Sequence, residues 1–203
     1  MHLAGNGSCF LFPQERDTLY CHTALLDCTK AFDKCRFDIL FKKLVDRNVP
    51  AVVTRVLMLV YEEQQAWVKW GKSRSRTFGI VNGTRQGSVL SPALFSVYMD
   101  NLIVKLRKSG VGCHLGGVFC GVVGYTDDLL LMAPSRSAME KMLGICEDYA
   151  KVNNLEFSTD PNPEKSKSKC IFMRGHLKMT KPVNLQLHGV DLPWVKTATH
   201  LGN

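Results

Sequence analysis

The sequence lacks the features that mark membrane, secreted and zinc-binding proteins. Its longest apolar runs, such as VLMLV and DLLLMA, are far shorter than the roughly 18 residues that a membrane-spanning helix needs. The N-terminal segment has no basic start followed by a long apolar region, as a secretory signal would. None of the eight cysteines forms a C-x-x-C pair, so we expect no zinc site. We predict an intracellular protein, nuclear or cytoplasmic, with reduced thiols and no membrane partner.

Acidic residues are also missing from one long stretch. From Gln64 to Met99 there is none, whereas five basic residues lie there: Lys69, Lys72, Arg74, Arg76 and Arg85. The whole chain has 26 basic and 18 acidic residues, a net charge of +8. This balance favours a polyanionic partner such as nucleic acid. The 203 residues, 45% hydrophobic and 22% charged, are typical of one or two globular domains.

Helical spacing of apolar residues predicts four helices of more than two turns. The first covers residues 36–48, with one apolar face: Phe37, Leu40, Phe41, Leu44 and Val45. The second begins at Pro50. The third begins at Ser91-Pro92, with Ser91 as N-cap, and runs to residue 108. The fourth begins with a capping box that spans Ser137 to Glu140.

Alternating and continuous apolar runs predict strands between these helices. CHTALLD, residues 21–27, is expected to be a strand that ends on Asp27. AWVKW and RTFGIV are predicted to pair across a GKSRS turn, and residues 114–130 to form strands with a turn at Gly116-Gly117. Short strands are expected at LEFS, KCIFMR and VNLQLHG. The pattern predicts an α+β fold with helices packed on a mostly antiparallel sheet.

Three polar stretches interrupt this apolar framework. Asp127 and Asp128 lie between two apolar runs, Asp27 ends another, and a glycine-containing loop with Arg85 precedes the helix at Ser91. Each stretch alone is typical of a turn, cap or loop. If Asp27 lies beside the Asp127–Asp128 hairpin, however, three carboxylates converge and repel one another by roughly 4 kcal/mol per pair at about 4 Å. Such a cluster requires a hard cation, above all Mg²⁺, which indicates phosphoryl or nucleotidyl transfer.

Taken in order, these stretches closely resemble the reverse transcriptase domain of non-LTR (LINE-type) retrotransposons. Asp27 with residues 30–33 resembles the first catalytic motif of that family, residues 83–95 the second and residues 125–128 the third. Residues 154–157 with Lys165-Ser166 resemble the fourth, and residues 200–202 the fifth. The resemblance covers residues 21–203, whereas residues 1–20 match poorly. It implies a polymerase palm-type antiparallel sheet with packed helices, part of the fingers and no thumb.

The resemblance implies a role for each matching residue. Asp27 and Asp127 would bind two Mg²⁺ ions, or Mn²⁺ as a substitute, supported by Asp128. Lys165 would donate a proton to the pyrophosphate, with Lys167 and Lys169 as rival candidates. Residues implied to bind the incoming nucleotide are Cys28, Lys30, Ala31, Phe32, Gln86, Gly87, Tyr125 and Thr126. Residues implied to contact primer or template are Arg85, Leu201 and Gly202.

The substrates implied are an RNA template, a DNA primer and deoxynucleoside triphosphates. Phe32 would exclude a 2′-hydroxyl, and Thr126 stands where the family usually has alanine. Trp67 and Trp70 could stack on bases, but tryptophan on a hairpin is more often core, and we expect core. Two functions remain open: an RNA-directed DNA polymerase, or a truncated or decayed retrotransposon copy that binds metal and nucleic acid with little catalysis. A metal-dependent nuclease would use similar carboxylates without needing Phe32.

Overall fold

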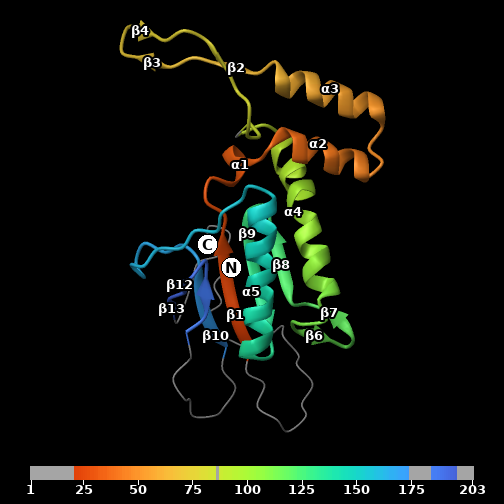
Figure 1. Cartoon of the computed structure of the whole chain (residues 1–203), viewed down its shortest axis with the longest axis vertical. Helices are drawn as coiled ribbons and strands as arrows, with labels where there is room; N and C mark the ends of the chain where they lie inside the picture. Colours follow the sequence, from red (N-terminus) through yellow and green to blue (C-terminus); the bar gives the residue numbers. More distant parts are fainter. Residues whose placement is uncertain (1–20, 86, 174–183, 196–203) are drawn as a thin grey trace.

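A computed structural model describes residues 21–85, 87–173 and 184–195 of the chain. Its centre is a five-stranded sheet in the order β13-β10-β1-β9-β8 (Figure 1). The bounds are β1 (Cys21–Asp27), β8 (Val122–Tyr125), β9 (Asp128–Ala133), β10 (Lys169–Met173) and β13 (Trp194–Val195). All neighbours pair antiparallel except β10 and β13, which are parallel. The predicted α+β fold with a mostly antiparallel sheet is therefore confirmed.

The central strand β1 is buried along most of its length. Residues 23–26 of CHTALLD are all buried, as expected for a strand with neighbouring strands on both edges. Helix α5 (Arg136–Val152) packs against β1 and β9, and α4 (Ser91–Lys108) packs against β8 and α5 (Figure 1). Two long helices thus cover one face of the sheet and hold its strands rigidly.

Three further helices precede the acid-free stretch: α1 (Ala31–Lys34), α2 (Phe37–Asp46) and α3 (Ala51–Glu62). Helix α2 buries the predicted Phe37, Leu40, Phe41 and Leu44, but Val45 is 60% exposed, so the expected apolar face was too wide. Successive helical residues are turned by about 100°, so Val45 is rotated away from Leu44 and from α4. Helix α3 buries only Thr54 and Tyr61.

Helix α4 covers Ser91–Lys108 as predicted, but two predicted N-caps were wrong. Ser91 is already inside α4, and its hydroxyl donates to the Arg85 carbonyl at 2.6 Å, while Leu90 takes the N-cap position. The N-cap of α5 is Ser135, whose hydroxyl accepts from the Ala138 amide, so no capping box begins at Ser137. Ser135 and Ser137 are only two residues apart, and the helix begins directly after the earlier one.

Short hairpins make up the remaining sheet structure. The acid-free stretch forms two ladders, β2 (Gln65–Ala66) with β5 (Phe78–Gly79) and β3 (Lys69–Trp70) with β4 (Ser73–Arg74). Its turn is shorter than the predicted GKSRS, since Ser73 and Arg74 are strand residues. Strands β6 (His114–Leu115) and β7 (Val118–Phe119) join at Gly116-Gly117 as predicted. Strands β11 (Gln186–Leu187) and β12 (Val190–Asp191) form the last ladder.

Two expectations about strands and core were also wrong. LEFS contributes only one bridge, between Phe157 and Cys28, rather than a strand. Trp67 is 44% exposed and Trp70 is 85% exposed, so neither belongs to the core. The β3–β4 hairpin lies at the far end of the molecule from the central sheet (Figure 1), where no core is available to receive these rings. Among the described residues, no helix has the length and apolar character needed to cross a membrane.

Candidate active site

The sheet register brings two of the predicted carboxylates opposite each other. Asp27, the last residue of β1, pairs with Asp128, the first residue of β9. Asp128 also pairs with Tyr125 across the β8–β9 hairpin, so Thr126 and Asp127 form its turn. The prediction that Asp27 lies on a strand beside this hairpin is therefore confirmed. The three aspartates meet at one end of the sheet because both apolar strands end there.

The environment of Asp27 is unfavourable for an isolated negative charge. Its side chain is 24% exposed, and Oδ2 is buried with no hydrogen-bond partner. Burial raises the pKa of Asp27, the Lys167 ammonium opposes this change, and the neighbouring Asp127 adds to it. The Lys167 Nζ lies 3.6 Å from Oδ2, close enough for an ion pair but too far for a hydrogen bond. This buried oxygen is thus available to a cation.

The lysine-rich loop is fixed beside Asp27 by its serines. The Ser168 hydroxyl accepts from the Asp27 amide at 3.2 Å, and the Ser166 hydroxyl donates to the Ser168 carbonyl at 2.8 Å. Both serines are buried, whereas Lys165 and Lys167 are exposed. Ser166 belongs to the fourth predicted stretch, but sequence reasoning missed Ser168, although the alternation in KSKSK indicates serines on one face and lysines on the other. The structure brings Lys167, rather than Lys165, next to the aspartates.

The hairpin turn holds Asp127 through its neighbour. Thr126 has a φ of 53°, in the left-handed region that a β-branched residue rarely adopts. The Thr126 Oγ1 lies 2.8 Å from Asp127 Oδ1 and 2.7 Å from the Tyr125 carbonyl, and its single proton can be donated to only one of them at a time. Tyr125 is 63% exposed. Alanine, the usual family residue at this position, has no hydroxyl. Thr126 therefore gives Asp127 a hydrogen-bonding neighbour that alanine could not provide, and it places a bulkier side chain in the turn.

These carboxylates fit a divalent cation, but they do not form a ready-made cage. Within residues 21–85, 87–173 and 184–195, no group of three or more His, Cys, Asp or Glu residues is arranged to hold a metal ion. The Asp27 Oδ2 atom has no hydrogen bond, and Asp128 is the cross-strand neighbour of Asp27. Both carboxylates can supply the hard oxygen ligands that such a cation prefers. Mg²⁺ keeps several waters and takes further ligands from substrate phosphates, so two or three carboxylates are sufficient.

The segment that follows Asp27 turns sharply into α1. Lys30 has a φ of 50° and precedes the short helix, whose first residue, Ala31, is buried. Burial, followed by the nearby Asp127, raises the pKa of the Cys28 thiol well above its usual range, so this side chain stays a neutral core group. The Phe32 ring is half-buried and lies 5.1 Å from the Phe95 ring of α4. Phe95 thus supports Phe32 from behind.

The second predicted motif is joined directly to the first by backbone hydrogen bonds. The Gly83 amide donates to the Cys35 carbonyl at 2.8 Å, and the Thr84 amide donates to the Phe32 carbonyl at 2.7 Å. A Cβ on Gly83 would lie 3.1 Å from the Asp33 backbone, and its φ is +93°, so only glycine fits this approach. Arg85 and Gly87 are exposed just beyond this contact. Gln86 lies outside the described residues.

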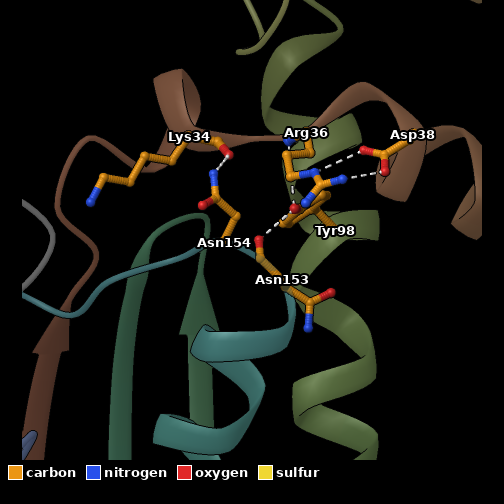
Figure 2. Close-up of polar contacts among 6 residues, drawn as sticks. All are labelled: Lys34, Arg36, Asp38, Tyr98, Asn153 and Asn154. Atoms are coloured by element: carbon orange, nitrogen blue, oxygen red, sulfur yellow. Dashed lines mark hydrogen bonds and ion pairs between the residues drawn. The ribbon is translucent and has the colours of Figure 1, made fainter.

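The fourth predicted stretch also packs against the first. The Thr29 amide donates to the Glu156 carbonyl at 2.8 Å, and Lys34 forms an ion pair with Glu156. The side-chain amide of Asn154 donates from Nδ2 to the Lys34 carbonyl at 3.2 Å (Figure 2). The first, second and fourth stretches therefore lie together in space. Leu201 and Gly202 of the fifth stretch lie outside the described residues.

A tyrosine links this region to the two long helices. The Tyr98 hydroxyl of α4 donates to the Asn153 carbonyl at 2.6 Å and accepts from the Arg36 amide at 3.5 Å (Figure 2). Asn153 directly follows α5, and Arg36 directly precedes α2. Sequence reasoning missed Tyr98, because nothing in the local sequence separates a connecting tyrosine from an ordinary core residue. These hydrogen bonds therefore connect the segment before α2 to α4 and to the end of α5.

Comparisons with known proteins agree with this arrangement. The family described as reverse transcriptase (RNA-dependent DNA polymerase) matches residues 8–202. A Pol polyprotein of the type-1 retrotransposable element R2 from Nasonia vitripennis is 29% identical over 135 residues, covering 66% of this chain and 13% of that protein. The probable RNA-directed DNA polymerase from transposon BS of Drosophila melanogaster is 28% identical over 189 residues, covering 92% of this chain and 20% of that protein.

A solved structure extends the likeness to the fold. Apo telomerase from Candida tropicalis, truncated from its C-terminal domain, superposes with a TM-score of 0.60 at 13% identity. The superposition covers 86% of this chain and 34% of the telomerase chain. At this identity the match shows a shared fold only. The chain spans only 13–20% of the retrotransposon proteins described above.

Proposed function

Because the chain belongs to the reverse transcriptase (RNA-dependent DNA polymerase) family, we propose that it forms the catalytic palm, with part of the fingers, of an RNA-directed DNA polymerase. The central five-stranded sheet is the palm, and the helices and hairpins between β1 and α4 are the finger portion. The observation that carries the proposal is the register of Asp27 with Asp128, beside a buried and unbonded Asp27 oxygen. A buried carboxylate oxygen without a hydrogen bond is unfavourable, and a bound cation would offset this cost.

The aspartates act by binding cations that the nucleotide brings. Mg²⁺ or Mn²⁺ at these carboxylates supplies a lowered pKa for the primer 3′-hydroxyl and charge neutralisation for the pyrophosphate in a two-metal nucleotidyl transfer. Asp27 and Asp127 hold the cations, and Asp128 supports them from the neighbouring strand position. Lys167, with its Nζ 3.6 Å from Asp27 Oδ2, partly neutralises Asp27. With a cation bound at Asp27, Lys167, or Lys165 from the same loop, would be the proton donor for the pyrophosphate.

The residues around the aspartates orient the nucleotide and the primer. The Cys28 carbonyl would be a further metal ligand, and the backbone of Lys30 and Ala31 would bind the triphosphate. Phe32, supported by Phe95, lies under the sugar and leaves no room for a 2′-hydroxyl. Gln86 and Gly87 lie beside the incoming nucleotide, and Tyr125 and Thr126 lie at the primer end. Arg85, Leu201 and Gly202 contact the RNA template and the DNA primer.

A combined test of metal binding and primer extension decides between this function and a weaker one. Asp127→Asn removes one negative charge from the cation site while keeping the shape of the side chain. We expect it to abolish Mg²⁺-dependent extension of a DNA primer on an RNA template and to weaken Mn²⁺ binding, measured by electron paramagnetic resonance. The matched control is Asp46→Asn on the exposed end of α2, which should change neither measurement. Circular dichroism checks that both variants fold.

The two measurements separate the two candidate functions. Thr126 and Lys167 already contact Asp127 and Asp27, an observation that favours a site that binds metal slowly or weakly. Mn²⁺ binding that depends on Asp127, without primer extension by the wild-type chain, would support a metal- and nucleic-acid-binding fragment with little catalysis. Mn²⁺ binding that ignores Asp127→Asn would overturn both assignments.

A further inference from the structure

The β3–β4 hairpin and the residues next to it carry two exposed tryptophans, Trp67 and Trp70. We call residues 67–76 the tryptophan hairpin. Its strands pair Lys69 with Arg74 and Trp70 with Ser73, and the Ser75 amide donates to the Val68 carbonyl at 2.9 Å. The Ser75 hydroxyl also accepts from the Val68 amide at 2.8 Å. The hairpin projects away from the central sheet (Figure 1), so the ladder and the Ser75 hydrogen bonds connect its two strands outside the core.

The two indoles are in different states. The Arg74 guanidinium lies 3.9 Å from the centre of the Trp67 ring, so one face of Trp67 already has a cationic partner. Trp70 is 85% exposed, the larger of the two exposed fractions. Leaving an indole in water forgoes the largest hydrophobic gain available to any side chain. The hairpin therefore presents one free aromatic platform.

The charged side chains of the tryptophan hairpin are all basic, and strand alternation places Lys69 and Arg74 on the face opposite Trp70. Lys69, Lys72, Arg74 and Arg76 are all exposed, and no described carboxylate forms an ion pair with any of them. Lys69 and Arg74 occupy directly opposite positions of the ladder, where like charges destabilise a hairpin. An anion that lies between them would remove this repulsion. The surface is therefore complementary to a chain of negative charges.

From this combination we propose that the tryptophan hairpin binds single-stranded nucleic acid, with an unpaired base stacked on Trp70 and its phosphate at Lys72 in the adjoining turn. Lys69, on the opposite face of the ladder, and Arg76 add positive charge. Aromatic platforms combined with cations are the usual means of binding single strands, because every base has a π-face. Bases in a duplex are already stacked on one another and would not use Trp70. A protein partner fits less well, since the centres of protein interfaces are depleted of lysine.

The inference deepens the proposed polymerase function, on which it rests, by assigning the unpaired strand a contact far from the aspartates. The hairpin is connected to α4 through β5 and the loop that contains Gly83, which belongs to the second predicted motif. The contact would hold template that has not yet reached the active site. It involves no metal, so binding can be measured without Mg²⁺.

The test is the affinity of the whole chain for a fluorescently labelled oligo(U) strand and for an abasic strand of equal length, in the absence of divalent cations. We expect Trp70→Ala to weaken oligo(U) binding by about 5- to 150-fold, the usual effect of losing one stacked base. Trp70→Phe should retain most of the affinity. Binding of the abasic strand should be equal for wild type and Trp70→Ala, because no base is present to stack.

A charge variant tests the phosphate contacts separately. Lys72→Gln should reduce the slope of log affinity against log salt by roughly 0.7, the value for one phosphate contact on a single strand. Lys141→Gln, an exposed lysine on α5, is the matched control and should leave the slope unchanged. Val52→Ala, which removes an exposed apolar side chain from α3, is the control for Trp70→Ala.

Two results would overturn the inference. One is oligo(U) affinity that is the same for wild type and Trp70→Ala. The other is a change in self-association on sedimentation caused by Trp70→Ala without a change in oligo(U) affinity, which would assign the hairpin to a protein contact. Neither result would affect the proposed catalysis, which is tested by Asp127→Asn in the presence of Mg²⁺. Loss of the metal site would likewise leave the oligo(U) measurement unchanged.

Discussion

Asp27 shows how single side chains shape this site. Its carboxylate is half-buried beside two other aspartates, and burial raises its pKa. Lys167 supplies a positive charge that offsets this effect, while Thr126 contacts the neighbouring Asp127. At the residue scale, the aspartates of the site have partners close by: Lys167 lies beside Asp27, and the Thr126 hydroxyl lies beside one oxygen of Asp127.

Phe32 carries the prediction about sugar selection. Phe32→Val should raise the efficiency of ribonucleotide relative to deoxyribonucleotide incorporation by about tenfold or more, because the smaller side chain leaves space for a 2′-hydroxyl. The measurement is the ratio of kcat/KM for the two nucleotides in primer extension. Phe78→Val, the same substitution at a half-exposed position on β5, is the control. An unchanged ratio in Phe32→Val would remove Phe32 from the nucleotide site.

At the scale of elements, the site is formed by loops that are far apart in the sequence but are in contact in the structure. The segment after β1, the loop before α4 and the segment after α5 are joined by backbone hydrogen bonds at Phe32, Cys35 and Thr29. At Gly83, the loop before α4 lies so close to the segment after β1 that an added Cβ would be 3.1 Å from the Asp33 backbone. The sequence predicted these three stretches and their order, because each carries a recognisable pattern. It did not predict their mutual contacts, which depend on the position of α4 over the sheet.

Gly83→Ala should therefore destabilise the protein more than an ordinary glycine replacement. The added Cβ would lie 3.1 Å from the Asp33 backbone at a φ of +93°, so we expect the free energy of unfolding to fall by at least about 2 kcal/mol. Gly110→Ala is the control. Gly110 has a φ of +71° but nothing within 4 Å of an added Cβ, so we expect a fall of about 1 kcal/mol there. Urea unfolding measures both, and equal losses would contradict the close approach.

At the scale of the whole molecule, a buried lysine joins the three helices that hold the site in place. Lys43 of α2 is 7% exposed, and its ammonium donates to the Tyr98 carbonyl of α4 and to the Tyr149 hydroxyl of α5. Its Nζ also lies 4.7 Å and 4.8 Å from the centres of the Tyr98 and Tyr149 rings. Burial lowers the pKa of Lys43 from 10.5 to about 8.

This lowered pKa predicts how stability depends on pH. The unfolded chain keeps the Lys43 proton up to about pH 10.5, whereas the folded chain loses it above about pH 8. The unfolded state thus binds more protons in this window, so the Lys43 contribution to the free energy of unfolding should rise with pH, by up to about 3 kcal/mol. The measurement is urea unfolding of wild type and Lys43→Met from pH 7.5 to 10.5, at intervals on the order of half a unit. A constant difference between the two proteins would show that Lys43 titrates normally.

Periodicity and local patterns were sufficient for the framework of this protein. The apolar runs predicted β1, β9 and β10, and the helical spacing predicted α2 to α5, because burial imposes a period that the sequence must follow. The ordered stretches around Asp27, Gly83 and Asp127 also indicated the family, which the match over residues 8–202 shows.

Only the tertiary structure decided which of these residues meet. The register that sets Asp27 opposite Asp128, the ion pair of Lys167 with Asp27 and the exposure of Trp70 all depend on contacts between distant parts of the chain. The register of β1 against β9 requires the apolar patterns of both strands to pack together, so the pattern of one strand alone does not specify it. A tryptophan is buried only where a core lies within reach, and the tryptophan hairpin projects beyond the core.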